Sequence, residues 1–162
     1  EDQAYDLLEK LHISYDRHDH KAITSVQDLD FTLPGQQVKN LVLKTKKSRN
    51  FYMVILHDEK QANLADLAER LGEKRLSFAS DEQLEELLHV PAGTVTPFGL
   101  MFDREKRIQV IVDEEVDRSL TVGFHPFINS TTLNIAYSDF EKIMDYLEHS
   151  IRIVACWVEI WK

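Results

Sequence analysis

Residues 37–56, QVKNLVLKTKKSRNFYMVIL, contain two apolar runs separated by a short basic turn. Runs of this length, rich in branched and aromatic side chains and joined by a few polar positions, predict an antiparallel β-hairpin. The two strands are expected at Val38–Lys44 and Phe51–His57. The segment therefore predicts two neighbouring strands of a sheet.

The cations of this hairpin occupy two places. Period-two alternation puts Lys39 on the same face of the first strand as Leu41 and Leu43. A lysine on an apolar strand face is usually an edge residue whose amine reaches water, although it can also serve a site. The other cations gather at the turn, which contains no acid: Lys44, Lys46, Lys47 and Arg49. A basic turn either discourages edge pairing or binds an anion.

The length and composition are those of one ordinary domain. The chain has 162 residues, is 43% hydrophobic and carries a formal net charge of −9, so it is long enough for a real core. No apolar run approaches membrane-spanning length, and the acidic start EDQAYDLLEK is unlike a signal peptide. A single cysteine, Cys156, excludes an internal disulfide and a Cys-rich zinc site, and indicates a cytoplasmic protein. The acidity argues against broad nucleic-acid binding, DNA included, but allows a local basic patch that grips one RNA.

Hydrophobic periodicity and capping signals outline the other elements. Helices are expected at 3–11, at 64–71 after Asn63, at 80–89 behind a Ser80–Gln83 capping box, and from a Ser138–Glu141 capping box to about residue 147. Strands are expected at 13–20, 109–112, 120–124 and 132–136. This order predicts an α+β fold, with a mixed, largely antiparallel sheet or partial barrel and flanking helices. Residues 1–150 are expected to form one domain, whereas 151–162 form a tail that adds an edge strand, packs against a partner or is foreign to the protein.

Familiar catalytic motifs do not occur: there is no nucleophile elbow, Walker loop or dinucleotide fingerprint. Histidines and aspartates cluster early in the chain: His12, Asp16, His18, Asp19 and His20. They form a metal cluster or a polar edge strand, and the second interpretation is preferred because an H-x-H pair alone is a weak signal. The acids at 113–117 are expected to face solvent. His125 either packs in a turn beside Pro126 or forms part of a pocket wall.

Residues 93–100, GTVTPFGL, form a loop with two glycines, a proline, small hydroxyls and no charge. Such a loop can bring backbone N–H groups close to a ligand, or can simply connect a helix to a strand. Together with Lys39 it outlines a small apolar pocket with one cation and several backbone donors. That pocket would suit a small neutral group with a polar linkage, such as an ester carbonyl.

Three segments, VKNLVLK, GTVTPFGL and VGFHPFINSTT, together resemble the YbaK/ProX-type aminoacyl-tRNA editing domains, the prolyl-tRNA synthetase associated domain family. The resemblance runs from about residue 18 to about residue 147, with the motifs in family order. The Lys-Asn-Leu and Gly-Phe-His-Pro forms are most similar to the free-standing alanyl-tRNA(Pro) deacylase branch. The resemblance implies the fold of this family and a hydrolase that requires neither cofactor nor metal.

The resemblance also implies roles for individual residues. Lys39 falls on the family's essential catalytic lysine. The substrate-binding residues implied are Ser25, Asn40, Gly93, Pro97, Phe98, Gly99, Gly123, His125, Pro126 and Asn129. The chain departs from the family pattern with Lys21 for a proline, Gln27 for an acid and Val38 for a small residue or cysteine. These departures leave Lys39 intact and leave the amino-acid preference open.

The activity implied is trans-editing, the hydrolysis of the ester in tRNA(Pro) mischarged with alanine. The four turn cations would contact acceptor-stem phosphates. Implied partners are mischarged tRNA(Pro) and, as a further candidate, prolyl-tRNA synthetase. Two alternatives stay open: a deacylase for another small aminoacyl group, such as cysteine or serine, and a non-catalytic module that binds tRNA or a synthetase.

Overall fold

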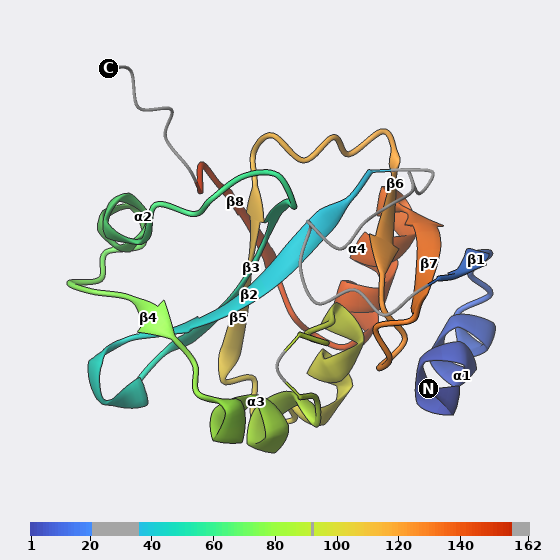
Figure 1. The fold of residues 1–162 in the computed structure, drawn as a ribbon, viewed down its shortest axis with the longest axis horizontal. Helices are drawn as coiled ribbons and strands as arrows, with labels where there is room; N and C mark the ends of the chain where they lie inside the picture. Colours follow the sequence, from blue (N-terminus) through green and yellow to red (C-terminus); the bar gives the residue numbers. More distant parts are fainter. Residues whose placement is uncertain (21–35, 92, 157–162) are drawn as a thin grey trace.

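The computed structural model describes residues 1–20, 36–91 and 93–156 (Figure 1). Its helical elements are α1 (Asp2–Lys10), α2 (Leu64–Arg70), α3 (Asp81–Leu88) and α4 (Tyr137–Tyr146), with short 3₁₀ turns η2 (Lys46–Ser48) and η3 (Pro97–Phe102). Its strands are β1 (Asp16–Asp19), β2 (Val38–Lys44), β3 (Phe51–His57), β4 (Ser77–Phe78), β5 (Ile108–Asp113), β6 (Thr121–Phe124), β7 (Thr131–Ala136) and β8 (Ile151–Val154). Within these three ranges, no helix has the length and apolar character needed to cross a membrane.

The strands form two sheets. The smaller has the order β1-β7-β6 and is antiparallel throughout. The larger has the order β4-β2-β3-β5-β8, in which β2 is antiparallel to both neighbours while β5 is parallel to β3 and β8. The α+β fold with a mixed, largely antiparallel sheet is confirmed, and the expected hairpin is β2–β3. The described strands make an open arrangement rather than a closed barrel.

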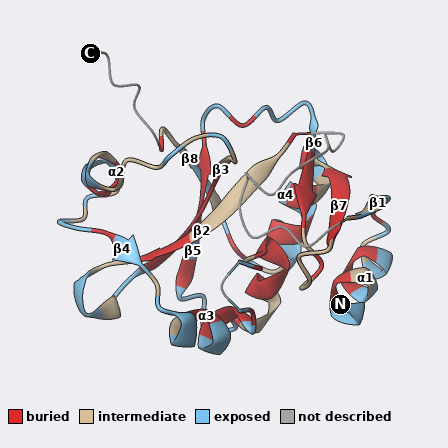
Figure 2. Cartoon of the chain, viewed as in Figure 1, coloured by how far each residue is buried: buried red, intermediate tan, exposed pale blue. Residues whose placement is uncertain are grey.

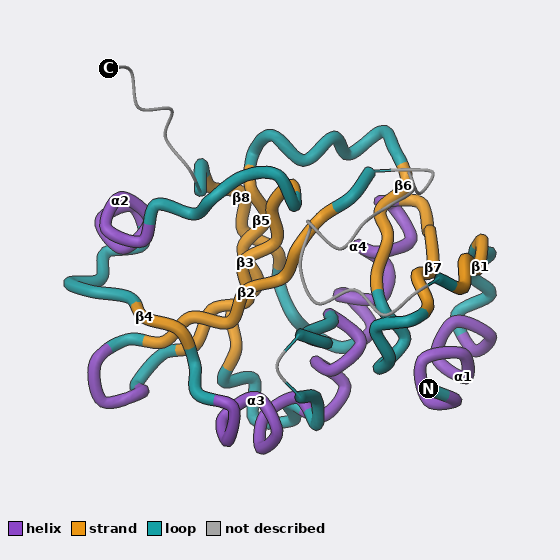
Figure 3. Tube along the Cα trace, viewed as in Figure 1, coloured by secondary structure: helices purple, strands orange, loops and turns teal. Residues whose placement is uncertain are grey.

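Gln36 joins the two sheets just before β2 begins. Its backbone N–H donates to the carbonyl of Thr121 at 3.0 Å, and it forms a parallel bridge with Val122 in β6. Its side chain exchanges two hydrogen bonds with the backbone of Asp117, at 2.7 and 3.0 Å, and its Oε1 lies 2.6 Å from His57 Nε2. From this junction β2 and β6 diverge (Figure 3).

The larger sheet separates two hydrophobic clusters. Most of β3 and β5 is buried (Figure 2). One face contributes Val42, Met53, Ile55, Val110 and Val112 to the main core, which α1, α3 and α4 complete. The other face contributes Leu43, Tyr52, Val54, Leu56 and Ile111 to a smaller cluster beneath α2. Alternation along β2 therefore places Asn40 on the main-core face and Lys39 on the α2 face.

Two of the expected helix starts are confirmed by their caps. Asn63 Oδ1 accepts from the N–H of Asp66 at 3.0 Å at the start of α2. Ser80 and Gln83 make both bonds of a capping box, at 2.9 and 3.2 Å, at the start of α3. Both signals are local, so a short stretch of sequence was enough to predict them.

The capping box expected at Ser138 and Glu141 is wrong. Helix α4 begins at Tyr137, and Ala136 occupies the N-cap position without a side-chain hydrogen bond. Strand β7 continues to Ala136, and the N–H of Tyr137 donates to the carbonyl of Leu120 at 3.2 Å. The helix thus starts directly from a paired strand, which leaves Ser138 already inside its first turn.

The end of β5 corrects a second expectation and is the place where residues 151–154 pair with the larger sheet. Asp113 was expected to face solvent but is 1% exposed, because its Oδ1 accepts from the backbone N–H of Cys156 at 2.9 Å. Strand β8 pairs in parallel with β5, so residues 151–154 add an edge strand to the larger sheet. This was one of the three roles considered for the tail.

Candidate active site

Lys39 lies near the start of β2, opposite Leu56 of β3. It is half-buried, and its amine makes no hydrogen bond or ion pair with any residue in the described ranges. Burial lowers the pKa of the Lys39 ammonium, and the nearby charge of Asp58 opposes this shift only in part. Burial also raises the pKa of Asp58. The result is a cation that is partly withdrawn from water and is not neutralised by a direct partner.

Asn40 connects β2 to the loop of residues 93–100. Its Nδ2 donates to the backbone carbonyl of Val95 at 3.2 Å, while its Oδ1 is buried and has no hydrogen-bond partner among the described residues. The residue that follows Lys39 thus anchors the glycine- and proline-containing loop that the sequence singled out. Two of the three segments that carry the family resemblance meet at this bond.

The 93–100 loop has an exposed end and a buried end. Gly93 is exposed at a φ of +86°, a left-handed conformation that favours glycine. Pro97, Phe98 and Gly99 are buried in η3. A Cβ on Gly99 would stand 3.0 Å from the Cβ and carbonyl oxygen of Leu88, so this glycine allows η3 to pack closely on α3. The structure gives these three residues a packing role, and their contact with a substrate stays a prediction.

Gly123 in β6 lies beside the face that carries Lys39. A Cβ at Gly123 would stand 2.7 Å from Thr132 Cγ2, 3.0 Å from Asn134 Oδ1 and 3.9 Å from Gln37 Oε1. Gln37 precedes Lys39 by two positions, so their side chains project to the same side of an extended chain. Gly123 therefore lets a polar surface of the smaller sheet approach the start of β2.

Thr132 and Asn134 belong to this polar surface and were not among the expected site residues. They are only 3% and 4% exposed, whereas their neighbours Leu133 and Ile135 enter the main core. The alternation of polar and apolar residues in TTLNIA was the signal for a strand with one polar buried face.

His125 follows β6 and is held as a neutral imidazole. Its Nδ1 donates to the carbonyl of Thr131 at 2.9 Å, and burial lowers the pKa of the ring despite that bond. The ring centroids of His125 and His20 lie 6.2 Å apart. The Nε2 atom of His20 lies 2.8 Å from Thr132 Oγ1. The Nε2 atom of His125 is thus available as a hydrogen-bond acceptor on the polar surface.

The loop after His125 packs against the 93–100 segment. The ring of Phe127 lies 6.5 Å from that of Phe98 and 5.8 Å from that of Phe102. Pro126 is buried and Asn129 is half-buried in the same loop. All three segments of the resemblance therefore come together in space. Ser25 lies outside the described residues.

The turn cations are not part of this constellation. Lys44 is five positions from Lys39 along β2, which corresponds to about 16 Å of extended strand. Lys46, Lys47 and Arg49 are exposed around η2 at the far end of the hairpin. The amine that the resemblance assigns to the ester and the cations it assigns to RNA thus occupy opposite ends of one strand.

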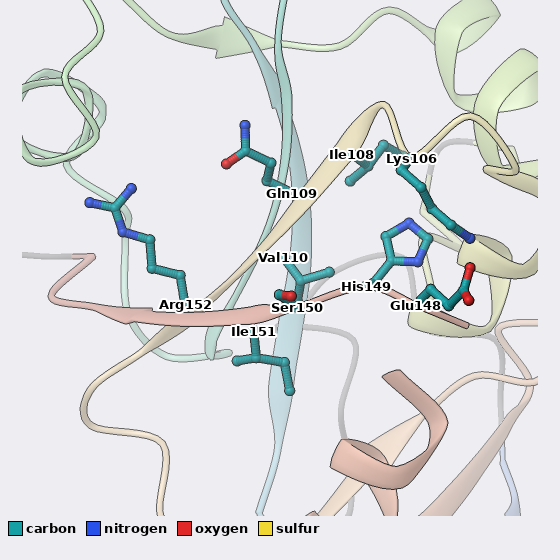
Figure 4. Close-up of a pocket in the computed structure, with 9 residues that line it drawn as sticks. All are labelled: Lys106, Ile108, Gln109, Val110, Glu148, His149, Ser150, Ile151 and Arg152. Atoms are coloured by element: carbon teal, nitrogen blue, oxygen red, sulfur yellow. The ribbon is translucent and has the colours of Figure 1, made fainter. Parts of the chain in front are cut away.

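A pocket of about 310 Å³ lies elsewhere, between the start of β5 and β8 (Figure 4). Its wall includes His149, whose Nε2 lies 3.1 Å from Asp103 Oδ2 and whose Nδ1 lies 3.0 Å from the carbonyl of Leu147. Lys106 Nζ donates to the same carbonyl at 2.7 Å. These groups are engaged with one another and fasten the end of α4, so this pocket is not the candidate site.

The early histidines do not gather with acids as a metal site in the ranges that the structure covers, since no three His, Cys, Asp or Glu side chains there approach one another as ligands would. Strand β1 pairs with β7 alone among the described strands and forms an edge of its sheet. His18 therefore belongs to a polar edge strand, and His20 follows directly after its end.

Comparison with known proteins bears directly on this constellation. Residues 20–143 match the model of the aminoacyl-tRNA editing domain. The chain is 31% identical to the prolyl-tRNA editing protein ProX of Acetoanaerobium sticklandii over 140 residues, 85% of each chain. It is 31% identical to prolyl-tRNA synthetase associated domain-containing protein 1 of Danio rerio, over 90% of this chain and 81% of the relative. A solved structure assigned provisionally as a trans-editing enzyme for prolyl tRNA synthetase shares the fold, with a TM-score of 0.68 at 17% identity, over 98% of this chain and 96% of that one. The chain belongs to the aminoacyl-tRNA editing domain family.

Proposed function

We propose that the protein is a trans-editing deacylase that hydrolyses the ester of mischarged tRNA(Pro), with alanine as the aminoacyl group. Membership of the editing family and similarity to a protein named for prolyl-tRNA editing support the reaction class. The observation that carries the proposal is the half-buried Lys39 amine, which has no hydrogen bond or ion pair among the described residues and directly precedes Asn40, the residue that bonds β2 to the 93–100 loop.

In this proposal Lys39 orients the aminoacyl ester by charge and hydrogen bonding. Backbone amides of the 93–99 and 123–125 segments confine the side chain and polarise the carbonyl as negative charge develops on its oxygen. A water molecule bonds to the carbonyl carbon, the ester C–O bond breaks, and the ribose oxygen takes up a proton. The products are the free amino acid and tRNA(Pro), and no protein nucleophile is required.

The roles of individual residues follow their positions. Asn40 holds the loop through Val95, and its unpartnered Oδ1 can accept a hydrogen bond from the substrate's amino group. His125, kept neutral by burial, offers Nε2 to a hydroxyl of the terminal ribose. Ser25, Gly93, Pro97, Phe98, Gly99, Gly123, Pro126 and Asn129 complete the set that we propose for substrate binding.

A separate editing pocket has a chemical rationale when tRNA is charged with proline. A synthetase site shaped for proline cannot strongly exclude a smaller apolar amino acid, because each missing methylene is worth only about 1–3 kcal/mol. An editing pocket that admits alanine and sterically rejects proline supplies the missing discrimination. We also propose that the protein acts in the cytoplasm, together with its substrate, and that prolyl-tRNA synthetase is a candidate partner.

The test is a panel of tRNA(Pro) charged with alanine, cysteine, serine or proline and incubated with the protein. We expect release of alanine well above the rate of the uncatalysed reaction, with prolyl-tRNA(Pro) left intact. Faster release of cysteine or serine would assign a different small substrate, and binding without any release would indicate a non-catalytic module.

A further inference from the structure

The tip of the β2–β3 hairpin and the segment before β4 form one continuous surface. Lys44 pairs with Ser77, and Leu43 pairs with Phe78, so β4 lies along the end of β2. Glu73 Oε2 accepts from Asn50 Nδ2 at 3.1 Å and from the hydroxyl of Tyr52 at 3.3 Å, which fixes the start of this segment against β3. We call this region the hairpin-tip surface: Lys44, Lys46, Lys47, Arg49, Lys74, Arg75 and Phe78.

Six cations crowd the hairpin-tip surface without direct neutralisation. Lys46, Lys47, Arg49, Lys74 and Arg75 are exposed, and Lys44 is half-buried. None of the six forms an ion pair with a residue in the part of the chain that the structure describes. Unpaired cations are otherwise unexpected in a protein with 28 acidic and 19 basic residues, because acids outnumber their possible partners.

Phe78 is the second unusual feature of this surface. At 59% exposure it is the most exposed of the large hydrophobic side chains in the described ranges. It lies on β4, the edge strand of the larger sheet (Figure 2). Cations alone could serve to protect an open sheet edge, but an exposed aromatic ring on that edge does the opposite. Edge protection therefore does not account for this combination of residues.

An exposed aromatic ring surrounded by cations is a combination of side chains that can bind a nucleic acid. Aromatic side chains stack on bases irrespective of sequence, while Lys and Arg contact the phosphates on either side. We propose that the hairpin-tip surface docks the acceptor end of the RNA, with Phe78 stacking on a base near the junction of single and double strand. This inference rests on the proposed function and adds Lys74, Arg75 and Phe78 to the four turn cations.

The spacing agrees with this assignment. Directly paired residues in antiparallel strands project to the same face, so Phe78, Leu43 and Lys39 share one face of the sheet. Leu43 is four positions from Lys39, or about 13 Å, and Phe78 lies one strand further across. At about 3.4 Å per stacked nucleotide, this separation corresponds to about four nucleotides. The unpaired 3′ end of an aminoacyl-tRNA has that length, so the first base pair would reach the hairpin-tip surface.

Acids limit the surface on one side. The first turn of α3 carries the exposed Asp81 and Glu82, and Gln83 Nε2 in that turn donates to Ser48 Oγ at 2.8 Å. A phosphate backbone would be repelled from α3 and guided over η2 and residues 74–78. The RNA would therefore approach the hairpin-tip surface from one side. This agrees with a duplex end whose ester is held at a fixed position near Lys39.

The experiment compares two substrates with the full-length protein: alanyl-tRNA(Pro) and a CCA trinucleotide carrying a 3′-alanyl ester. Phe78→Ala is expected to weaken binding of uncharged tRNA(Pro) by roughly tenfold. Lys74→Gln with Arg75→Gln is expected to reduce the slope of log K against log salt by about 1–2. Both variants should hydrolyse the trinucleotide ester at the wild-type rate, since that substrate ends before the surface.

Matched controls are Tyr146→Ala, an exposed aromatic on α4, and Lys142→Gln with Arg152→Gln, exposed cations on α4 and β8. Control values equal to those of the test variants would overturn the proposal, as would an unchanged salt slope. Phe78-dependent binding to vesicles containing phosphatidylserine would assign the surface to a membrane instead. Absence of hydrolysis by the wild-type protein would contradict the proposed function, while the binding measurements would still decide the surface.

Discussion

The side-chain amide of Asn40 donates a hydrogen bond to the carbonyl of Val95 at 3.2 Å, and this bond holds the 93–100 loop against β2 at the position that follows Lys39. Residues 55 positions apart in the sequence are thereby placed in one site. Because Asn40 lies on the main-core face of β2 and Lys39 on the opposite face, the same short segment both anchors the loop and presents the amine. Substitutions at Asn40, which act on the anchoring of the loop, can therefore be tested separately from substitutions at Lys39, which act on the amine.

Asn40→Asp tests the anchoring role directly, because it replaces the Nδ2 donor with an acceptor and keeps the size and the Oδ1 acceptor of the side chain. We expect KM for alanyl-tRNA(Pro) to rise several-fold, and the free energy of unfolding to fall by about 1–3 kcal/mol as an unmatched carboxylate faces the Val95 carbonyl. Steady-state kinetics and urea unfolding measure the two effects. Asn63→Asp, which keeps the acceptor that caps α2, is the control and should change neither. An unaltered KM in Asn40→Asp would rule out the anchoring role.

Replacement of Lys39 by methionine removes the amine while retaining most of the stem that packs on the sheet. We expect kcat/KM for alanine release to fall by at least about 100-fold, since a positioned charge at the reacting group is lost. The unfolding midpoint should stay close to that of the wild type. Activity within a few-fold of the wild type would show that Lys39 is not the catalytic cation.

The pH profile provides an independent test of Lys39. Burial lowers the pKa of its ammonium below the ordinary value of 10.5, and the protonated form is the one that the mechanism uses. Activity should therefore fall as pH rises, beginning below the pH at which an ordinary lysine loses its proton. Lys39→Arg should retain partial activity with no alkaline fall, because a guanidinium keeps its charge. Single-turnover rates corrected for spontaneous ester hydrolysis measure this, and an identical alkaline limb in Lys39→Arg would contradict it.

Gly123→Ala should destabilise the smaller sheet. The added methyl would stand 2.7 Å from Thr132 Cγ2, closer than real contacts allow, so we expect a loss of about 1–3 kcal/mol in the free energy of unfolding. Thr132→Ser removes that Cγ2 atom, and the double variant should recover part of the loss. Urea unfolding of the four proteins in the cycle measures the coupling, and purely additive losses would show that the two residues do not interact.

The buried pair of Asp103 and His149 should control stability in acid. Burial raises the pKa of Asp103, but hydrogen bonds from His149 and from the N–H groups of Ile108 and Arg107 outweigh it and hold that pKa below its usual range. The unfolded chain therefore binds a proton at Asp103 more readily than the folded chain does. The stabilisation from the ionised Asp103 carboxylate is present above about pH 4 and is lost as pH falls through the pKa of this group in the folded protein.

Asp103→Asn is the variant that tests this contribution. We expect a loss of about 1–3 kcal/mol near pH 7, because the buried carboxylate that accepts from His149 and from the N–H groups of Arg107 and Ile108 is lost. The loss should shrink toward pH 3, where the wild-type carboxylate is itself partly protonated. Urea unfolding across this range measures it. Asp66→Asn, which breaks the surface pair with Arg70, should cost below about 1 kcal/mol at every pH, and an equal loss in both variants would contradict the prediction.

Local patterns predicted most of the fold, and long-range contacts explain the exceptions. The hairpin and the caps at Asn63 and Ser80 depend on neighbouring residues, so alternation and spacing were sufficient. The start of α4 depends on Leu120, which is distant in the sequence, and the burial of Asp113 depends on the backbone of Cys156. Neither contact leaves a mark in the local sequence.

The same distinction holds for the candidate site. Period-two alternation and loop composition singled out Lys39 and the 93–100 loop, but only the family resemblance connected them with the 123–129 loop, since no spacing rule relates the three to one another. The resemblance alone did not indicate that Asn40 bonds to Val95 or that Gly99 is needed for packing against Leu88. Those are consequences of how the strand, the loop and α3 meet in space.

Gln36 joins the two sheets by hydrogen bonds and can act as a hinge between them. Its hydrogen bonds to the backbone of residues 117 and 121 and its contact with His57 fix β2 to β6 at one end, whereas the far ends of these strands lie apart. A small rotation of one sheet against the other about Gln36 would barely move this residue. It would displace residues farther along β2 and β6 much more. In the function we propose, such a rotation would change the distance between the start of β2 and the 123–125 segment. If the proposed function is correct, substitutions at positions 36, 57 or 117 should therefore change which amino acid is accepted, although these residues need not contact it.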